Sequence, residues 1–304
     1  MEFNTESTVF FTDPFSMPKP SLILCLFFSN TLLLNLLHLC GMLQPTHPAT
    51  GRRILAENYS LAATWKRGED LFQIRGQNGL LHCGIDPLPQ VCRKKEVLET
   101  SDQVLESFYP VSPTIDLQQV NVYKEEMNCT GELSLGFHKM TLSWIRVVWP
   151  TSNCLSPIGS GFRGNYPYPH AHTLYFLETA DPNCKLRPEQ FRAKMIMFTF
   201  GNALARAHKL YGPQSLLERP VTVQAVGTNG RIFQFLVFQL NTTELSGDDG
   251  IKNQVWLDED VELYDFAKVR PLIKKKEVKV PAGLAGYKPE TFSKFLALYL
   301  HGAV

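Results

Sequence analysis

The sequence lacks the motifs of the common enzyme and metal-site classes. It contains no G-x-S-x-G, H-E-x-x-H or G-x-G-x-x-G pattern, and the glycines at 227 and 230 lack the spacing and lysine of a phosphate-binding loop. None of its seven cysteines forms a C-x-x-C pair, and an odd number of unpaired thiols is typical of a reducing compartment. We therefore expect no catalytic residues, no metal and no cofactor.

Two short histidine motifs come closest to reactive chemistry. His170 and His172 flank one alanine, so an extended segment would place both rings on one side, but no Asp, Glu or Cys lies nearby to complete a ligand set. His82 and Cys83 are adjacent, and adjacent residues of a strand point to opposite faces, which excludes a nucleophile–base pair. We interpret all four as packing or surface residues.

Net charge is also nearly absent, at +1, which argues against a free-standing nucleic-acid binder but not against a subunit held by many partners. The charge is segregated, because residues 244–265 hold eight acids against Lys252 and residues 268–279 hold six bases against Glu277. Asp258, Glu259, Asp260 and Glu262 are interpreted as a solvated acidic face. The basic segment is either a solvated loop that balances these acids or a contact with RNA phosphates. Its candidate residues are Lys268, Arg270, Lys274, Lys275, Lys276 and Lys279.

Charged residues are missing altogether from residues 21–43, a run long enough to span a bilayer as a helix. With sequons at Asn58, Asn128 and Asn241, this run suggests an alternative class of protein, a type II membrane or secreted glycoprotein. Polar residues interrupt the run, and Asn241 directly follows a predicted core strand, where a glycan fits poorly. The local sequence leaves open whether residues 21–43 are a membrane segment.

The clearest structural signal is a hairpin over residues 221–243. Asn229-Gly230 is the pair that supplies positive φ angles to a tight turn. The second strand carries apolar residues of both parities, so it is predicted to be covered on both faces and to lie inside a sheet. One face would hold Ile232, Leu236, Phe238 and Leu240, and the other Phe233, Phe235 and Val237.

Other segments complete an α+β pattern. Strands are expected at 59–67, 71–75 and 173–177, and helices at 94–108, 188–211 and from Pro289 onward. In the helix over 188–211 the apolar residues wrap most of the way round, which predicts burial on several sides. The predicted fold is mixed, with a mainly antiparallel sheet and packed helices.

Several long segments resemble one family, the mitochondrial ribosomal proteins of the large subunit numbered thirty-seven, whose wider family includes a paralogue first numbered as small-subunit protein thirty. The resemblance covers roughly residues 35–131 and 161–304, and residues 35–54 match a family element, which argues against a membrane anchor. The matching segments are Tyr59–Gly76, Leu105–Leu117, Leu186–Ala207, Pro220–Thr243 and Tyr287–Ala303.

Two departures from the family divide the chain. Residues 1–34 replace the family's amino-terminal region and its presequence, and residues 132–160 are extra. Both are interpreted as divergent segments or as errors in the gene model. We therefore expect one α+β domain over residues 35–304, with 132–160 as a poorly ordered inserted loop.

The resemblance implies a non-catalytic structural component of the mitochondrial large ribosomal subunit in the matrix. The family has no catalytic residues to carry over. Its implied partners are large-subunit proteins, including the paralogous family member, with limited contact to mitochondrial rRNA. No membrane is expected.

Overall fold

The computed structural model describes residues 20–67, 70–91, 121–122, 145–147, 165–178, 186–212, 216–245, 251, 253–268, 272–274, 277–280 and 283–303. The helices are α1 (Pro20–Gly41), the 3-10 helix η1 (Pro48–Arg52), α3 (Pro188–Tyr211) and α4 (Pro289–Leu300). The strands are β1 (Arg53–Arg67), β2 (Asp70–Gly84), β3 (Asn121–Val122), β4 (Ile145–Val147), β5 (His170–Leu177), β6 (Leu216–Thr228), β7 (Ile232–Thr242), β8 (Gln254–Leu257), β9 (Val261–Glu262), β10 (Tyr264–Lys268), β11 (Leu272–Lys274), β12 (Glu277–Val280) and β13 (Gly283–Tyr287).

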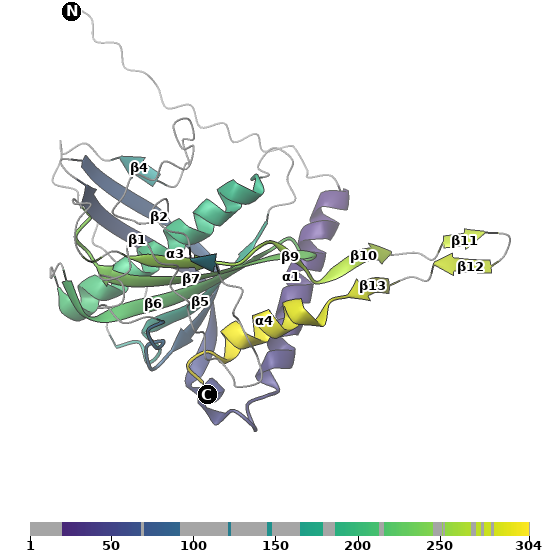
Figure 1. Cartoon of the computed structure of the whole chain (residues 1–304), viewed down its shortest axis with the longest axis horizontal. Helices are drawn as coiled ribbons and strands as arrows, with labels where there is room; N and C mark the ends of the chain where they lie inside the picture. Colours follow the sequence, from purple (N-terminus) through teal and green to yellow (C-terminus); the bar gives the residue numbers. More distant parts are fainter. Residues whose placement is uncertain are drawn as a thin grey trace, which may run out of the picture.

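One nine-stranded sheet organises the molecule. Its order is β1-β2-β5-β6-β7-β8-β3, with β4 also on β2 and β9 also on β7. The described pairings in this sheet are antiparallel except for β5 with β6, which are parallel. Helix α3 covers one face, and α1 and α4 cover the other (Figure 1). The predicted α+β class with a mainly antiparallel sheet is confirmed.

The hairpin predicted over residues 221–243 is formed by β6 and β7, which pair from Val221 with Leu240 to Thr228 with Phe233. Gly230 has a φ of 94°, a value that only glycine adopts without strain. Asn229 contributes differently from the expectation, because its φ is not positive. Instead its Oδ1 accepts the N–H groups of Arg231 at 3.0 Å and Ile232 at 2.9 Å.

Strand β7 is buried on both faces, as predicted. It lies between β6 and β8, and its alternate residues enter two separate hydrophobic clusters. Leu236, Phe238 and Leu240 pack in the first cluster, under α3, whereas Phe233, Phe235 and Val237 pack in the second, under α1 and α4. The two clusters are the two halves of the hydrophobic core.

Helix α3 lies inside the curve of the sheet, and every residue from Met195 to Ala207 is buried. The Phe200 ring contacts Trp65 of β1 at 5.1 Å between centroids and Phe238 of β7 at 5.8 Å. Because three strands separate β1 from β7, the sheet must curl around the helix (Figure 1). Gly201 permits the close approach, since a Cβ there would lie 3.0 Å from side chains of β1 and β2. The predicted multi-sided burial is confirmed.

Helix α1 contains most of the uncharged run. Its face of Leu33, Leu36, Leu37 and Cys40, spaced i, i+3, i+4 and i+7, is buried in the second cluster. The side chains of α1 are described from Ser29 onward, and among the described residues no helix is both long and apolar enough to cross a membrane. The helix continues through residues 34 and 35, where a division of the chain is predicted.

Other expectations are met in part or lie outside the described residues. Strands β1 and β2 form the hairpin expected within 59–75, but they pair over a longer stretch, from Arg53 with Gly84 to Arg67 with Asp70. The helix expected over 94–108 is outside the described residues. Of residues 132–160 only β4 is described, and it pairs with β2. The inserted loop stays a prediction.

A charge placed on the face of β7 that α1 and α4 cover tests the two-sided burial. Phe235 is 4% exposed, so Phe235→Asp would bury a carboxylate without a partner and is expected to lower the free energy of unfolding by more than about 3 kcal/mol. Leu216→Asp, at a position of β6 that is 51% exposed, is the matched control and should change it by less than about 1 kcal/mol. Urea denaturation measures both. Equal midpoints for the two variants would contradict the assignment.

Candidate nucleic-acid interface

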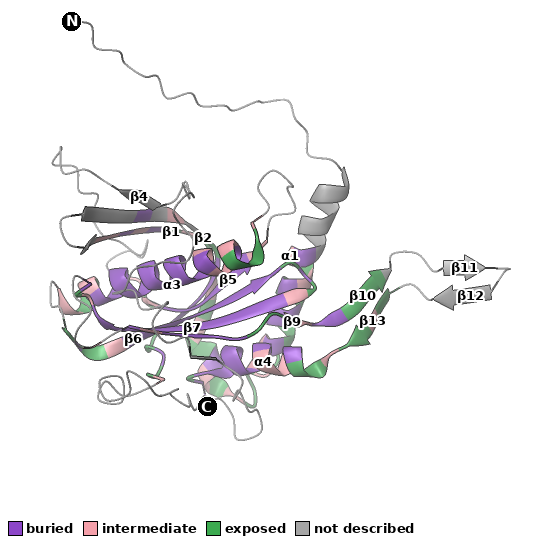
Figure 2. Cartoon of the chain, turned by 45° about the horizontal axis from the view of Figure 1, so that its top comes forward, coloured by how far each residue is buried: buried purple, intermediate pink, exposed green. Residues whose placement is uncertain are grey.

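The basic segment lies on a two-stranded extension, which we call the arm (Tyr264–Tyr287). Strands β10 and β13 pair antiparallel from Tyr264 with Tyr287 to Lys268 with Gly283. Strands β11 and β12 pair beyond them, from Leu272 with Val280 to Lys274 with Glu277. The ribbon leads away from the body of the molecule, with β11 and β12 at its far end (Figure 1). Figure 2 shows that β10 and β13 are mostly exposed.

The base of the arm is fastened to the body from two sides. Arg231, in the β6–β7 turn, donates to the Tyr264 carbonyl at 3.2 Å and pairs with Glu262 at 2.6 Å. Lys288, at the start of α4, pairs with the other oxygen of Glu262 at 2.8 Å and with Asp265 at 3.2 Å. The hydrogen bond from Lys288 lowers the pKa of Glu262 below its ordinary value. These contacts fix the direction in which the arm leaves the sheet.

The six predicted contact residues all belong to the arm, although their side chains lie outside the described part. The backbone of Lys268 ends β10, that of Lys274 ends β11, and that of Lys279 lies in β12. Arg270, Lys275 and Lys276 fall between described strands. In the register Lys274 is directly opposite Glu277. Sequence reasoning did not identify the ribbon that carries these residues, and their contact with RNA stays a prediction.

The acidic residues before the arm are paired with cations of the body, so the interpretation as a solvated face is wrong for part of the segment. Asp258 is only 3% exposed and bonds to Lys294 of α4. Asp260 bonds to Arg192 of α3. Together with Glu262, these acids hold α3, α4 and the β6–β7 turn against the sheet. Each of these three acids thus has a cationic partner in the described part of the body.

A buried polar cluster ties the carboxyl terminus to the sheet. Arg53 of β1 donates to the carbonyl oxygens of Tyr299, at 2.6 Å, and His301. The Nδ1 of His301 lies 3.0 Å from the Oε1 of Gln224 on β6, whose Nε2 donates at 3.0 Å to Leu298 and to Thr173. These bonds satisfy the carbonyls at the end of α4. The cluster is structural, because its polar groups bond to one another.

The histidines of this region are neutral at physiological pH. Burial and the nearby Arg53 charge lower the pKa values of His82, His172 and His301 to about 3. His82 and His172 hydrogen-bond to the Tyr175 hydroxyl at 3.0 Å and to the Asp86 carbonyl at 2.6 Å. Buried neutral rings of this kind are packing groups.

The two sequence motifs do not assemble into reactive sites. Cys83 lies in the first cluster, on the face opposite His82, as expected, and burial raises the pKa of its thiol to about 12. His170 bonds to Arg206 of α3 at 2.9 Å, while His172 bonds on another side. Within the described residues, no three His, Cys, Asp or Glu side chains are grouped to hold a metal ion.

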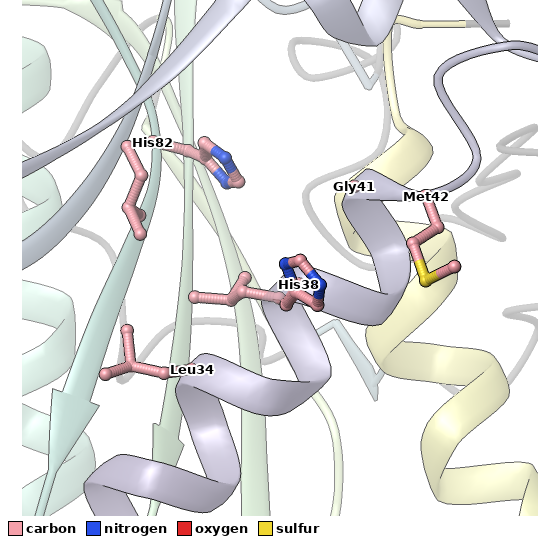
Figure 3. Close-up of a pocket in the computed structure, with 7 residues that line it drawn as sticks. Leu34, His38, Gly41, Met42 and His82 are labelled. Atoms are coloured by element: carbon pink, nitrogen blue, oxygen red, sulfur yellow. The ribbon is translucent and has the colours of Figure 1, made fainter.

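A pocket of about 500 Å³ opens between α1 and the β1–β2 hairpin. Figure 3 shows that His38 from α1 and His82 from β2 reach it across an otherwise apolar lining. Because the His82 ring is neutral and bonded to Tyr175, the pocket holds no evident acid–base pair. The remaining lining residues are Leu34, Leu37, Gly41, Met42 and Leu55.

The glycoprotein alternative is not favoured by this geometry. Asn241 is fully buried, and its Oδ1 accepts from Gln239 at 3.0 Å, so a glycan cannot be attached in the folded chain. The described part of the uncharged run packs into the core through α1. The observed features instead define an α+β body with a ribbon that carries the basic segment.

Comparison with known proteins shows that the chain is similar to ribosomal proteins of mitochondria. Residues 183–291, from the start of α3 past the arm, match the family model described as "Mitochondrial 28S ribosomal protein S30 (PDCD9)". More extended matches carry the name "Large ribosomal subunit protein mL37". The relative from Gallus gallus is 53% identical over 274 residues, and that from Rattus norvegicus is 48% identical over 273.

These matches confirm the resemblance seen in the sequence. Each of these alignments covers 89% of this chain, and the relative from Bos taurus is 46% identical over the same share. The chain is thus homologous to mL37 proteins over most of its length. It spans a little over half of the relatives it matches, 56% of the Gallus gallus protein and 57% of the other two.

The buried histidines predict a steep pH dependence of stability. Their pKa values are about 3 in the folded chain against 6.5 when unfolded, so below pH 6.5 the unfolded state binds protons that the folded state rejects. Stability is then full above pH 6.5 and falls as the pH decreases, by about 1.4 kcal/mol per pH unit for each ring.

Urea denaturation between pH 7.5 and pH 5.5 measures this slope. His82→Asn should reduce the slope by the contribution of one proton. A slope that is identical in wild type and His82→Asn would contradict the assignment of a buried neutral ring.

Proposed function

We propose that this chain is a non-catalytic structural component of the large subunit of the mitochondrial ribosome, and that its arm contacts ribosomal RNA. The observation that carries the first part is the identity of 46–53% over 89% of the chain to proteins named for the large ribosomal subunit. The match to a mitochondrial ribosomal family model supports the same assignment. It implies action in mitochondrial translation and a location in the matrix.

Position and charge support the second part. The arm carries six Lys and Arg residues against two acids, a formal charge of +4, whereas the whole chain carries +1. Asp258, Asp260 and Glu262 have other counterions, so they do not account for the basic segment. A basic ribbon that projects from a body can reach phosphates without bringing the body's own acids close to them. RNA contact is accordingly confined to a small part of the molecule.

The remaining surface is assigned to protein neighbours. Because the residues outside the arm carry a net charge of −3, the body is expected to bind large-subunit proteins, among them the paralogous family member. Helix α4 provides only part of this surface, since its residues from Ala297 to Leu300 are buried. The non-catalytic role is supported by the neutral histidines and by the raised pKa of the Cys83 thiol.

The basic segment is tested by removing its three consecutive lysines. Lys274→Gln, Lys275→Gln and Lys276→Gln together are expected to weaken association with large-subunit particles and to reduce the slope of log affinity against log salt, by about one unit for each phosphate that is no longer neutralised. Co-sedimentation across a salt series measures both quantities.

A matched control removes the same charge from the body. Arg52, Lys209 and Arg219 are exposed and lie outside the arm, so their triple replacement by Gln should leave the slope unchanged. If the arm variant folds and retains the wild-type slope and affinity, the lysines are a solvated loop. Attachment would then depend on protein surfaces.

A further inference from the structure

We propose that one face of the arm is a stacking platform for unpaired RNA nucleotides, built from Tyr287 and Phe266. This inference rests on the proposed RNA contact and adds to it the class of RNA that is bound. The rings would take the base faces, and the lysines the phosphates. No sequence motif indicated this site, because its residues come from two strands that only the register brings together.

The register of β10 and β13 defines the face. Tyr264 is opposite Tyr287, Phe266 is opposite Ala285 and Lys268 is opposite Gly283. Since alternate residues of a strand share a face, Tyr287 and Phe266 lie on one side of the ribbon. Phe266 and Tyr287 are diagonal neighbours, a relation that separates Cβ atoms by about 7 Å.

Exposure distinguishes these rings from the aromatics of the core. Tyr287 is 58% exposed and Phe266 is 43% exposed, whereas Tyr264 at the base of the same face is 6% exposed. Exposed aromatic rings on a β-surface are the usual platforms on which proteins stack single-stranded bases. The arm therefore presents apolar ring area that the body's core does not use.

Charge on the two faces of the ribbon points to RNA as the occupant. The acid of this part of the arm, Asp265, lies on the opposite face, opposite Gly286, and is paired with Lys288. The aromatic face has no acid in β10 or β13, and the sequence between these two strands carries a basic segment that suits RNA phosphates.

Base-face contact selects unpaired nucleotides. In a duplex each base face is covered by its neighbours, and the major groove of A-form RNA is too deep and narrow for side chains to read. Loops, bulges and single strands leave the base faces open. The anchored base of the arm, through Arg231 and Lys288, holds the platform in place before binding and reduces the entropy lost on association.

The test measures binding of the full chain to two RNA probes, a short single-stranded oligouridylate and a short duplex, by fluorescence anisotropy over a salt series. Tyr287→Leu and Phe266→Leu are each expected to weaken oligouridylate binding about tenfold without changing the salt slope, because stacking involves no ion release. Duplex binding should not change. Tyr287→Phe keeps the ring and should bind like wild type.

Leu284→Ala is the matched control. Leu284 is 51% exposed on the opposite face of the same ribbon, opposite Ala267, so its truncation should leave both affinities unchanged. The thermal midpoint of each variant shows whether the body has stayed folded. If one ring variant unfolds, the other ring variant and Tyr287→Phe still test the platform.

The outcomes separate this inference from the proposed function. Unchanged oligouridylate binding by both ring variants, with a slope that still depends on Lys274–Lys276, overturns the stacking platform and leaves the phosphate contact. Loss of association with large-subunit particles, with unchanged binding to both free RNA probes, makes the face a protein contact and overturns the platform as well. A third outcome overturns both the stacking platform and the proposed RNA contact of the arm. In this outcome the wild-type chain binds neither probe, and the triple lysine change leaves association with particles unchanged.

Discussion

The burial of β7 on both faces is the constraint on which the rest of the structure depends. Phe233, Phe235 and Val237 enter one hydrophobic cluster, and Leu236, Phe238 and Leu240 enter the other. A strand with two apolar faces requires a cover on each side, because each exposed ring would lose its transfer free energy. Helix α3 supplies one cover, and the pair α1 and α4 supplies the other.

The position of the arm follows from the second of these covers. Helix α4 must lie on the β7 face to bury Phe295 against Phe233, and its first turn then lies beside β9, where Thr291 donates to the Glu262 carbonyl at 2.6 Å. The chain leaves the sheet after β9 and returns at Lys288, so the arm is a loop between two fixed points. Its direction is set by packing in the core, although none of its tip residues belongs to the core.

The sequence predicted the elements whose signals are local, and it missed those that depend on distant pairing. The Asn229-Gly230 turn and the apolar circumference of α3 are local, and the structure confirms the hairpin and the buried helix. The parallel pairing of β5 with β6 joins segments that are separated by all of α3, so no pattern within either strand predicts it. The pairing of Asp258 with Lys294 could likewise not be predicted, because the acidic segment around Asp258 has the composition of a solvated surface. The arm was missed because its strands are short, because β13 contains two glycines and because Pro271 and Pro281 interrupt the segment between strands, all of which weaken a strand pattern.

The small net charge of the chain conceals two regions of opposite sign. The arm sums to +4 within a chain of +1, so the remaining residues sum to −3. A body of that charge is repelled by phosphate, whereas the arm is attracted, and the two effects act on parts that the anchoring at Arg231 and Lys288 holds in a fixed relation. In the function that we propose, such a molecule meets an RNA surface arm first and keeps its body among proteins. A composition-based argument against nucleic-acid binding therefore holds for the body and fails for the arm, because electrostatic attraction depends on where charge is placed and only weakly on its total.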